Sequence, residues 1–212
     1  MLTLYDYLPS QNAWKVRQML AHLGRPYRTV EVSIFEGEGR APDILRLNPS
    51  GKVPILVEAD GQALAESNAI LAYLADGTPY LPGQPMARAR VHQWLSFEQE
   101  QVEANIGTLR HWTLTGKLAR RPEFLVAAKR TAGQRALDIL NRELTTRPFI
   151  AGNYSIADIA LYAYAAKAEE AGYDLTPLSG LRDWVKRVAA QPGHLAVSWP
   201  YAIDPHSAGE LP

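Results

Sequence analysis

The stretch "NPSGKVPIL", Asn48 to Leu56, places a proline inside what otherwise reads as a buried strand. The apolar, β-branched run Val53–Val57 follows a turn signal of Asn, Pro, Ser and Gly, which is typical of a strand entry. Pro54 has no N–H to donate to a sheet ladder, so it is not expected within a central strand. Two explanations are open at this point. Either the strand lies at a sheet edge, or the bond before Pro54 is cis and presents its backbone to a ligand.

The overall composition is that of an ordinary globular protein, with 212 residues, of which 47% are hydrophobic and 21% charged. Lys+Arg and Asp+Glu are both 22, so no broad basic field exists to bind nucleic acid or an anionic membrane surface. The N-terminus has no secretory signal pattern, and no apolar run approaches the roughly 18 residues of a spanning helix. We therefore expect a cytoplasmic protein with no membrane or nucleic-acid partner.

The chain contains no cysteine, which excludes structural disulfides, thiolate metal sites and a cysteine nucleophile. Its five histidines, at positions 22, 92, 111, 194 and 206, include no pair spaced three or four residues apart. We therefore expect no metal site.

The first 76 residues predict the order β-α-β-α-β-β-α. A right-handed β-α-β unit makes the first two strands parallel, and the tight turn at Asp60-Gly61 makes the last two antiparallel. Ser67 stands where it would cap the last helix of this half. The expected elements are a strand at 2–6, a helix at about 13–23, a strand with alternating residues at 30–34, a short helix at 43–47, a strand at 53–57, a brief strand near Leu64 and a helix after residue 67.

Beyond residue 76 every strong signal is helical. Residues 77–86 contain five Gly or Pro in ten and read as a linker. Ser155 with Asp158 at N3 predicts a capping box at the start of a helix that Gly172 ends. The other expected helices are a long one through Val91 and Val102, one at about 122–145 and one at about 181–190; the tail 195–212 is expected to be irregular.

A β-α-β-α-β-β-α domain with a proline opening its third strand, followed by an all-helical domain, resembles the cytosolic glutathione transferases. The motifs that carry the resemblance are Asn48–Pro54, Leu64–Ile70 and Ser155–Asp158, and the resemblance covers nearly the whole chain. It implies a thioredoxin-like α/β domain at 1–76, a linker at 77–86 and an all-α domain at 87–212. It also implies that Pro54 is cis, which would expose the Val53 backbone to the cysteinyl part of glutathione.

The resemblance further implies how the other parts of glutathione are held. Ser67 would bind the γ-glutamyl carboxylate through its hydroxyl and backbone N–H, Glu66 would hold the amino group, and Lys52 would lie near the glycyl carboxylate. The residues alone also allow a simpler interpretation. Glu66 and Ser67 suit an ordinary helix start, where acidic side chains favour the dipole, and Lys52 suits a solvated surface.

Catalytic hydroxyls of the family, either tyrosine or serine, lie between the first strand and the first helix, and this segment contains both. Tyr7 aligns with the tyrosine of tyrosine-type classes, and Ser10 with the serine or threonine of serine-type and Nu-class enzymes. The pattern Pro9-Ser-x-Asn-x-x-Lys-Val-Arg17 is more similar to the latter and brings in Asn12 as a second donor. We favour Ser10, then Asn12, then Tyr7. The alternative is that Ser10 only caps the helix and Tyr7 packs in the core.

The leading hypothesis is a bacterial serine-type or Nu-class-like glutathione transferase that adds the thiolate of its co-substrate glutathione to a small electrophile, in the manner of detoxification enzymes. Because the chain has no thiol of its own, cysteine-type classes are excluded. Two alternatives stay open: glutathione-dependent disulfide or peroxide reduction, and a non-enzymatic interaction module with the same fold. The resemblance also implies a homodimer with a two-fold contact through the helix at 87–115. No motif fixes the second substrate.

Overall fold

A four-stranded mixed sheet organises the N-terminal part of the protein. The computed structural model describes residues 1–207, which divide into two units: Met1–Ala75 together with the segment from Pro192 on, and Asp76–Gln191. The strands are β1 (Leu2–Asp6), β2 (Tyr27–Glu31), β3 (Ile55–Val57) and β4 (Ala63–Ala65), in the order β2-β1-β3-β4. β1 and β2 are parallel, and β3 is antiparallel to both β1 and β4, so the predicted directions are confirmed.

The position of Pro54 answers the question that its sequence raises. β3 lies between β1 and β4, so the explanation by an edge strand is wrong. The strand begins at Ile55, one residue later than the proline, and the missing N–H therefore falls outside the ladder. The Val53–Pro54 peptide bond is cis.

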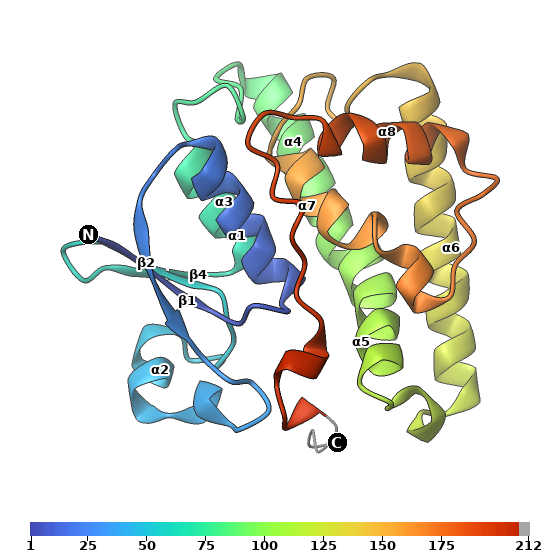
Figure 1. The fold of residues 1–212 in the computed structure, drawn as a ribbon. Coiled ribbons are helices and arrows are strands. Elements are labelled where there is room, and N and C mark those ends of the chain that lie inside the picture. The colour runs from blue at the N-terminus through green and yellow to red at the C-terminus, as the bar shows by residue number, and fades with distance from the viewer. Residues whose placement is uncertain (208–212) are drawn as a thin grey trace. The chain divides into compact units, whose positions relative to one another are not determined.

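Helices cover both faces of the sheet in the first unit (Figure 1). α1 (Gln11–His22) packs on α3 (Ser67–Ala75) on one face, and α2 (Pro42–Leu47) lies on the other, after a 3-10 turn at Glu38–Arg40. The side chains of Tyr5, Ile55 and Val57 gather with Val32 and Ile44 on the α2 side. Because side chains alternate along a strand, Leu4 and Leu56 point to the other face, where both are fully buried.

Other predicted boundaries also shift. α1 begins at residue 11 rather than 13 because Ser10 is its cap. β2 lies at 27–31 rather than 30–34, since pairing along the whole of β1 decides the strand and not its own alternation. Ser67 is the first residue of α3 and not its cap; Glu66 precedes the helix, and its carbonyl accepts the N–H of Ile70.

The segment from Pro192 on packs along α1. The Trp14 indole N–H donates to the Leu195 carbonyl at 3.1 Å, and the Leu195 N–H donates to Gln18 Oε1 at 2.7 Å. The Gln18 amide in turn donates to the Gly193 carbonyl at 3.0 Å. Up to residue 207 the segment is irregular, as expected, except for one 3-10 turn at Tyr201–Ile203, and the last part of the expected irregular tail, 208–212, lies outside the described residues. The contacts group it with the thioredoxin-like unit, although its place in the sequence follows the helical domain.

The second unit is all helical. Its central helix α7 (Ile156–Ala165) is almost completely buried, and apart from Asp158 and two tyrosines its residues are apolar, which is typical of a core helix. A turn at Ala168–Ala171 follows α7, and it is this turn, not α7 itself, that Gly172 ends in a left-handed conformation. The other elements are α4 (Pro85–Phe97), which continues as a π-helix at Glu98–Gly107 into α5 (Thr108–Leu114), a 3-10 turn at Leu118–Arg120, α6 (Glu123–Thr146) and α8 (Ser179–Ala189).

The predicted capping box at the start of α7 is present. The buried Asp158 carboxylate accepts from the backbone N–H of Ile150 at 2.9 Å, from the N–H and hydroxyl of Ser155, and from the Trp184 indole at 2.8 Å. One side chain thus joins the helix start, the preceding loop and α8.

Replacing this carboxylate tests its role in stability. We expect Asp158→Ala to lower the free energy of unfolding by about 3 kcal/mol, because several buried donors lose their acceptor together. Asp183→Ala is the matched control, since its carboxylate forms an exposed ion pair with Lys186 at 3.1 Å and its loss should change stability by less than about 0.5 kcal/mol. Urea denaturation of the three proteins makes the comparison; equal midpoints for the two variants would contradict it.

Candidate functional site

The strand register brings four loop segments to one edge of the sheet. Ile55 of β3 pairs with Tyr5 of β1 on one side and with Ala65 of β4 on the other. The residues just beyond these pairs, Pro54 and Glu66, therefore lie next to the end of β1. Because β2 runs parallel to β1, the segment after Glu31 leaves the sheet at the same edge.

Ser10 caps α1 at this edge. Its backbone is extended (φ −67°, ψ 122°), and its Oγ accepts the N–H of Ala13 at 3.2 Å. The Ser10 N–H donates to the Tyr7 carbonyl at 2.8 Å, which closes the turn between β1 and α1. Capping uses a lone pair of the hydroxyl, so the O–H proton remains able to donate to a ligand. The capping interpretation and the catalytic one are compatible.

Asn12 and Ser67 join the starts of two helices. The Ser67 hydroxyl, which is buried, donates to Asn12 Oδ1 at 3.2 Å. Asn12 lies in the first turn of α1 and Ser67 opens α3, so the N-termini of both helices meet here. Backbone N–H groups and the two dipoles make such a place favourable for anions.

Glu66 has a positive φ of 69°, the one non-glycine residue with this conformation in the described part of the chain. For a residue with a Cβ this conformation costs about 1–3 kcal/mol, and such outliers concentrate at functional sites. Its side chain is exposed beside the buried Ser67.

The Asn48–Pro54 motif forms a shaped turn. Asn48 Nδ2 donates to the Lys52 carbonyl at 2.8 Å, and its Oδ1 accepts from the N–H and hydroxyl of Ser50. Val53 packs against the core on the α2 side. The fold thus brings six of the predicted residues to one edge of the sheet: Ser10, Asn12, Val53, Pro54, Glu66 and Ser67. The Lys52 side chain is exposed, and its position adds no support for the predicted contact with the glycyl carboxylate.

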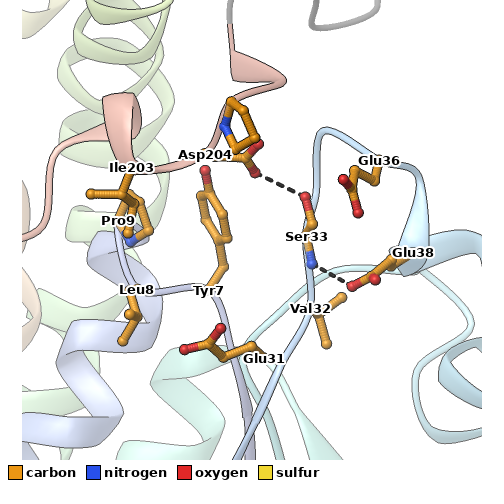
Figure 2. Close-up of a pocket in the computed structure, with 11 residues that line it drawn as sticks. Tyr7, Leu8, Pro9, Glu31, Val32, Ser33, Glu36, Glu38, Ile203 and Asp204 are labelled. Atoms are coloured by element: carbon orange, nitrogen blue, oxygen red, sulfur yellow. Dashed lines mark hydrogen bonds between the residues drawn. The ribbon is translucent and has the colours of Figure 1, made fainter.

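Tyr7 is buried and forms part of a pocket of about 320 Å³ (Figure 2). Its ring packs edge-on against Phe35 at 5.8 Å and tilted against Tyr201 at 6.2 Å. Figure 2 shows its hydroxyl directed toward Asp204 of the C-terminal segment. The lining residues are Tyr7, Leu8, Pro9, Glu31, Val32, Ser33, Glu36, Glu38, Ile203, Asp204 and Pro205.

Polar contacts hold the C-terminal segment over this pocket. The Ser33 hydroxyl donates to Asp204 Oδ2 at 2.8 Å, and the Ser33 N–H donates to Glu38 Oε2 at 2.6 Å. His206 Nε2 lies 2.6 Å from Glu36 Oε1. No sequence signal points to these residues, because neither the 32–38 loop nor the irregular tail has a periodicity that indicates where it folds.

The described residues contain no group of three or more His, Cys, Asp or Glu side chains arranged to hold a metal ion. Across the same residues, no helix combines the length and the apolarity that a membrane span requires.

Two family models match the chain. The model for "Glutathione S-transferase, N-terminal domain" matches residues 9–76, and that for "Glutathione S-transferase, C-terminal domain" matches residues 123–187. The chain belongs to the glutathione S-transferase family. The fold class expected from the sequence, a thioredoxin-like domain followed by a helical one, is confirmed.

Individual relatives agree with this assignment. The disulfide-bond oxidoreductase YfcG of Escherichia coli is 30% identical over 200 residues, which are 91% of this chain and 92% of YfcG. A crystal structure of a glutathione S-transferase from Xanthobacter autotrophicus has a TM-score of 0.90 and 41% identity, covering 96% of this chain and 99% of that one. A glutathione transferase from Pseudomonas putida, solved with one glutathione disulfide per subunit, has a TM-score of 0.79 and 27% identity, covering 91% and 88%.

His22 contributes a pH-sensitive contact between α1 and the C-terminal segment. Its Nδ1 lies 3.0 Å from the Pro192 carbonyl, which can only accept, and its Nε2 lies 3.0 Å from the Gln18 amide nitrogen, which donates. These contacts fit the neutral ring, with the proton on Nδ1. Burial lowers the pKa of His22, and nearby His194, whose pKa is also lowered by burial, adds to the effect.

Acidification should therefore loosen this contact. Since the folded pKa of His22 is below its ordinary value of about 6.5, the unfolded chain binds more protons below that pH, and stability falls as the pH drops through this range. Between about pH 7.5 and pH 5.5 we expect the urea midpoint of the parent protein to shift downward relative to that of His22→Ala. The buried Asp158, whose pKa burial raises to about 6, shifts both midpoints in the opposite direction by the same amount. His92→Ala, at an exposed position on α4, is the control and should follow the parent. Parallel midpoints for all three proteins would refute this.

Proposed function

We propose that the protein is a glutathione transferase that holds glutathione at this edge of the sheet and stabilises its thiolate with a hydrogen bond from Ser10. The observation that carries the proposal is the convergence of Ser10, Asn12 and Ser67 with two helix N-termini beside the Val53–Pro54 backbone. This arrangement favours a small ligand that carries negative charge. Glutathione has two carboxylates and supplies the thiol that the chain lacks.

The residues suit the parts of the tripeptide. The first N–H groups of α3 have no partner within the helix and are suited to a γ-glutamyl carboxylate, to which the Ser67 hydroxyl can turn from Asn12 Oδ1. The exposed Glu66 carboxylate is suited to the amino group. The Val53 backbone would pair with the cysteinyl residue, and Lys52 is flexible enough to reach the glycyl carboxylate from solvent.

The energies are sufficient for thiol activation. A free thiol has a pKa of about 8.5, and each unit of depression needs about 1.36 kcal/mol of preference for the anion. A hydroxyl donating to a charged acceptor supplies about 1.5–3 kcal/mol, and the N-terminus of α1 about 0.3–1 kcal/mol. Together they lower the thiol pKa by about one to three units, and a drop of more than about 1.5 units makes thiolate the main species at pH 7. No general base from the protein is required.

The pocket next to Tyr7 is proposed to take the electrophile, since it adjoins the turn that ends at Ser10. Its volume of about 320 Å³ fits a small molecule. Four carboxylates, from Glu31, Glu36, Glu38 and Asp204, stand among its lining residues, and none of those residues is basic. An uncharged electrophile is therefore favoured over an anionic one.

A second candidate function is the reduction of disulfides by glutathione, as in Nu-class proteins. The similarity to a protein named disulfide-bond oxidoreductase and to one solved with glutathione disulfide supports it. In this reaction the bound thiolate attacks a disulfide sulfur and releases one thiolate. A second glutathione thiolate then attacks the glutathione sulfur of the mixed disulfide, which releases the other substrate thiolate and forms glutathione disulfide. The same Ser10 and Asn12 serve both reactions.

Binding and two assays separate these functions. We expect retention on immobilised glutathione, turnover of a neutral chlorinated nitroaromatic, and slower turnover of its carboxylate-bearing analogue. Turnover of a mixed disulfide alone would favour the reductase, and binding without either activity would favour an interaction module. Absence of glutathione binding at millimolar concentration would exclude both enzymatic functions.

Ser10→Ala tests the thiolate donor. We expect kcat to fall about 10–100-fold and the pH–rate midpoint to rise, with the KM for glutathione nearly unchanged because the other residues still hold the tripeptide. The alanine also removes the helix cap, at about 0.5–2 kcal/mol of stability. Ser10→Gly separates the two effects, since glycine retains most of the capping but has no hydroxyl, and Ser10→Thr should retain activity. Full activity of Ser10→Ala, with loss in Asn12→Ala or Tyr7→Phe, would assign the donor to that residue instead.

A further inference from the structure

The turn that carries Tyr7 and Ser10 is held from α1 by one buried arginine. Arg17 Nη1 donates to both oxygens of the Asp6 carboxylate, at 2.6 and 2.7 Å, and Nη2 donates to the Leu8 carbonyl at 2.9 Å. Asp6 is fully buried at the end of β1, and Arg17 is 9% exposed. One guanidinium thus fixes the last residue of the strand and the tip of the turn that follows it.

The local sequence gives this turn little support of its own. The Ser10 N–H bonds to the Tyr7 carbonyl, so Leu8 and Pro9 are the two central residues. A proline at the second central position disfavours the common type I turn, because it moves the preceding residue out of the helical region. The hydrogen bond from Arg17 to the Leu8 carbonyl stabilises this turn, which its own residues do not favour.

We propose that Arg17 is a positioning residue for thiol activation: it fixes the turn 7–10 so that the Ser10 hydroxyl lies where it donates to the sulfur of bound glutathione. The inference rests on the function proposed above. The charge of Arg17 is balanced by Asp6, so Arg17 acts by positioning the turn and not by attracting the substrate. A loosened turn moves Ser10 but leaves the β3–β4 and α3 residues that hold the tripeptide in place.

The test measures the pKa of bound glutathione, from the ultraviolet absorbance of the thiolate and from the pH dependence of kcat. For Arg17→Met we expect this pKa to rise by about one unit and kcat at pH 7 to fall about three- to fivefold, as the thiolate fraction does, with less than about a threefold change in the KM for glutathione. A purely structural role would lower the melting temperature without moving the pKa of the thiol on the folded protein. Arg25→Met is the matched control: it breaks an ion pair with Glu58 at 3.1 Å in the same unit and should leave the pKa unchanged.

Two further variants keep the test decisive if Arg17→Met does not fold. Asp6→Asn combined with Arg17→Met removes the uncompensated buried carboxylate and should restore folding but not the low thiol pKa. Arg17→Lys keeps the charge beside Asp6 with one nitrogen in place of two, and should give a thiol pKa between those of the parent and Arg17→Met. A parent-like thiol pKa in the folded double variant would overturn the proposal.

Ser10→Ala separates the failure of this inference from that of the proposed function. If Arg17 acts through Ser10, adding Arg17→Met to Ser10→Ala changes the thiol pKa no further. If the two substitutions instead raise the thiol pKa additively, Arg17 does not act through Ser10. If Ser10→Ala raises the pKa and Arg17→Met does not, the inference fails and the donor stands. If only Arg17→Met raises it, the positioning of the turn stands and the donor is another group on it. If neither does, both fail.

Discussion

The pairing of β3 between β1 and β4 is the constraint on which the candidate site depends. It sets the end of β1, the start of β3 and the end of β4 side by side, so that residues about 40 to 60 positions apart in sequence become neighbours. A slip of one residue would turn Ile55 and Val57 from the α2 side of the sheet to the α1 side. Both side chains would then lose the neighbours against which they pack. The buried packing of both faces therefore also fixes the position of the Val53–Pro54 bond and of Glu66.

On this frame the chain builds an anion-favouring place without a net positive charge. The formal charge of the protein is zero, and the charge of Arg17 in the adjoining turn is balanced by Asp6. The favourable field comes instead from the N-termini of α1 and α3, which the hydrogen bond between Ser67 and Asn12 holds together. No excess of basic side chains is needed at this place, because the backbone N–H groups at the helix starts supply the donors for an anion.

The absence of cysteine gives the family assignment its chemical meaning. A thioredoxin-like domain without its own thiol is suited to use the thiol of a ligand, which agrees with both proposed reactions. The C-terminal segment completes the surroundings: it lies along α1 through Trp14 and Gln18 and places Tyr201 and Asp204 at the pocket beside Tyr7. The contact of this segment with His22 is sensitive to pH, because burial lowers the pKa of that histidine.

The sequence by itself determined the fold class, the family and most of the residues at the sheet edge. Local signals were enough for the order of strands and helices: the turn and proline at Asn48–Pro54, the capping box at Ser155–Asp158, and hydrophobic periodicity in the helices. The family followed from the resemblance of the motifs Asn48–Pro54, Leu64–Ile70 and Ser155–Asp158 to the glutathione transferases. Strand boundaries failed where partner strands decide, as in β2, whose own alternation pointed three residues too far along the chain. Only the tertiary structure revealed the contacts of Arg17, Ser33 and the C-terminal segment. A buried arginine gives no signal in sequence of which carboxylate and carbonyl it will join, and an irregular segment has no period from which its docking face can be read. These contacts link positions up to 181 residues apart, so they exist only once the sheet and α1 have formed.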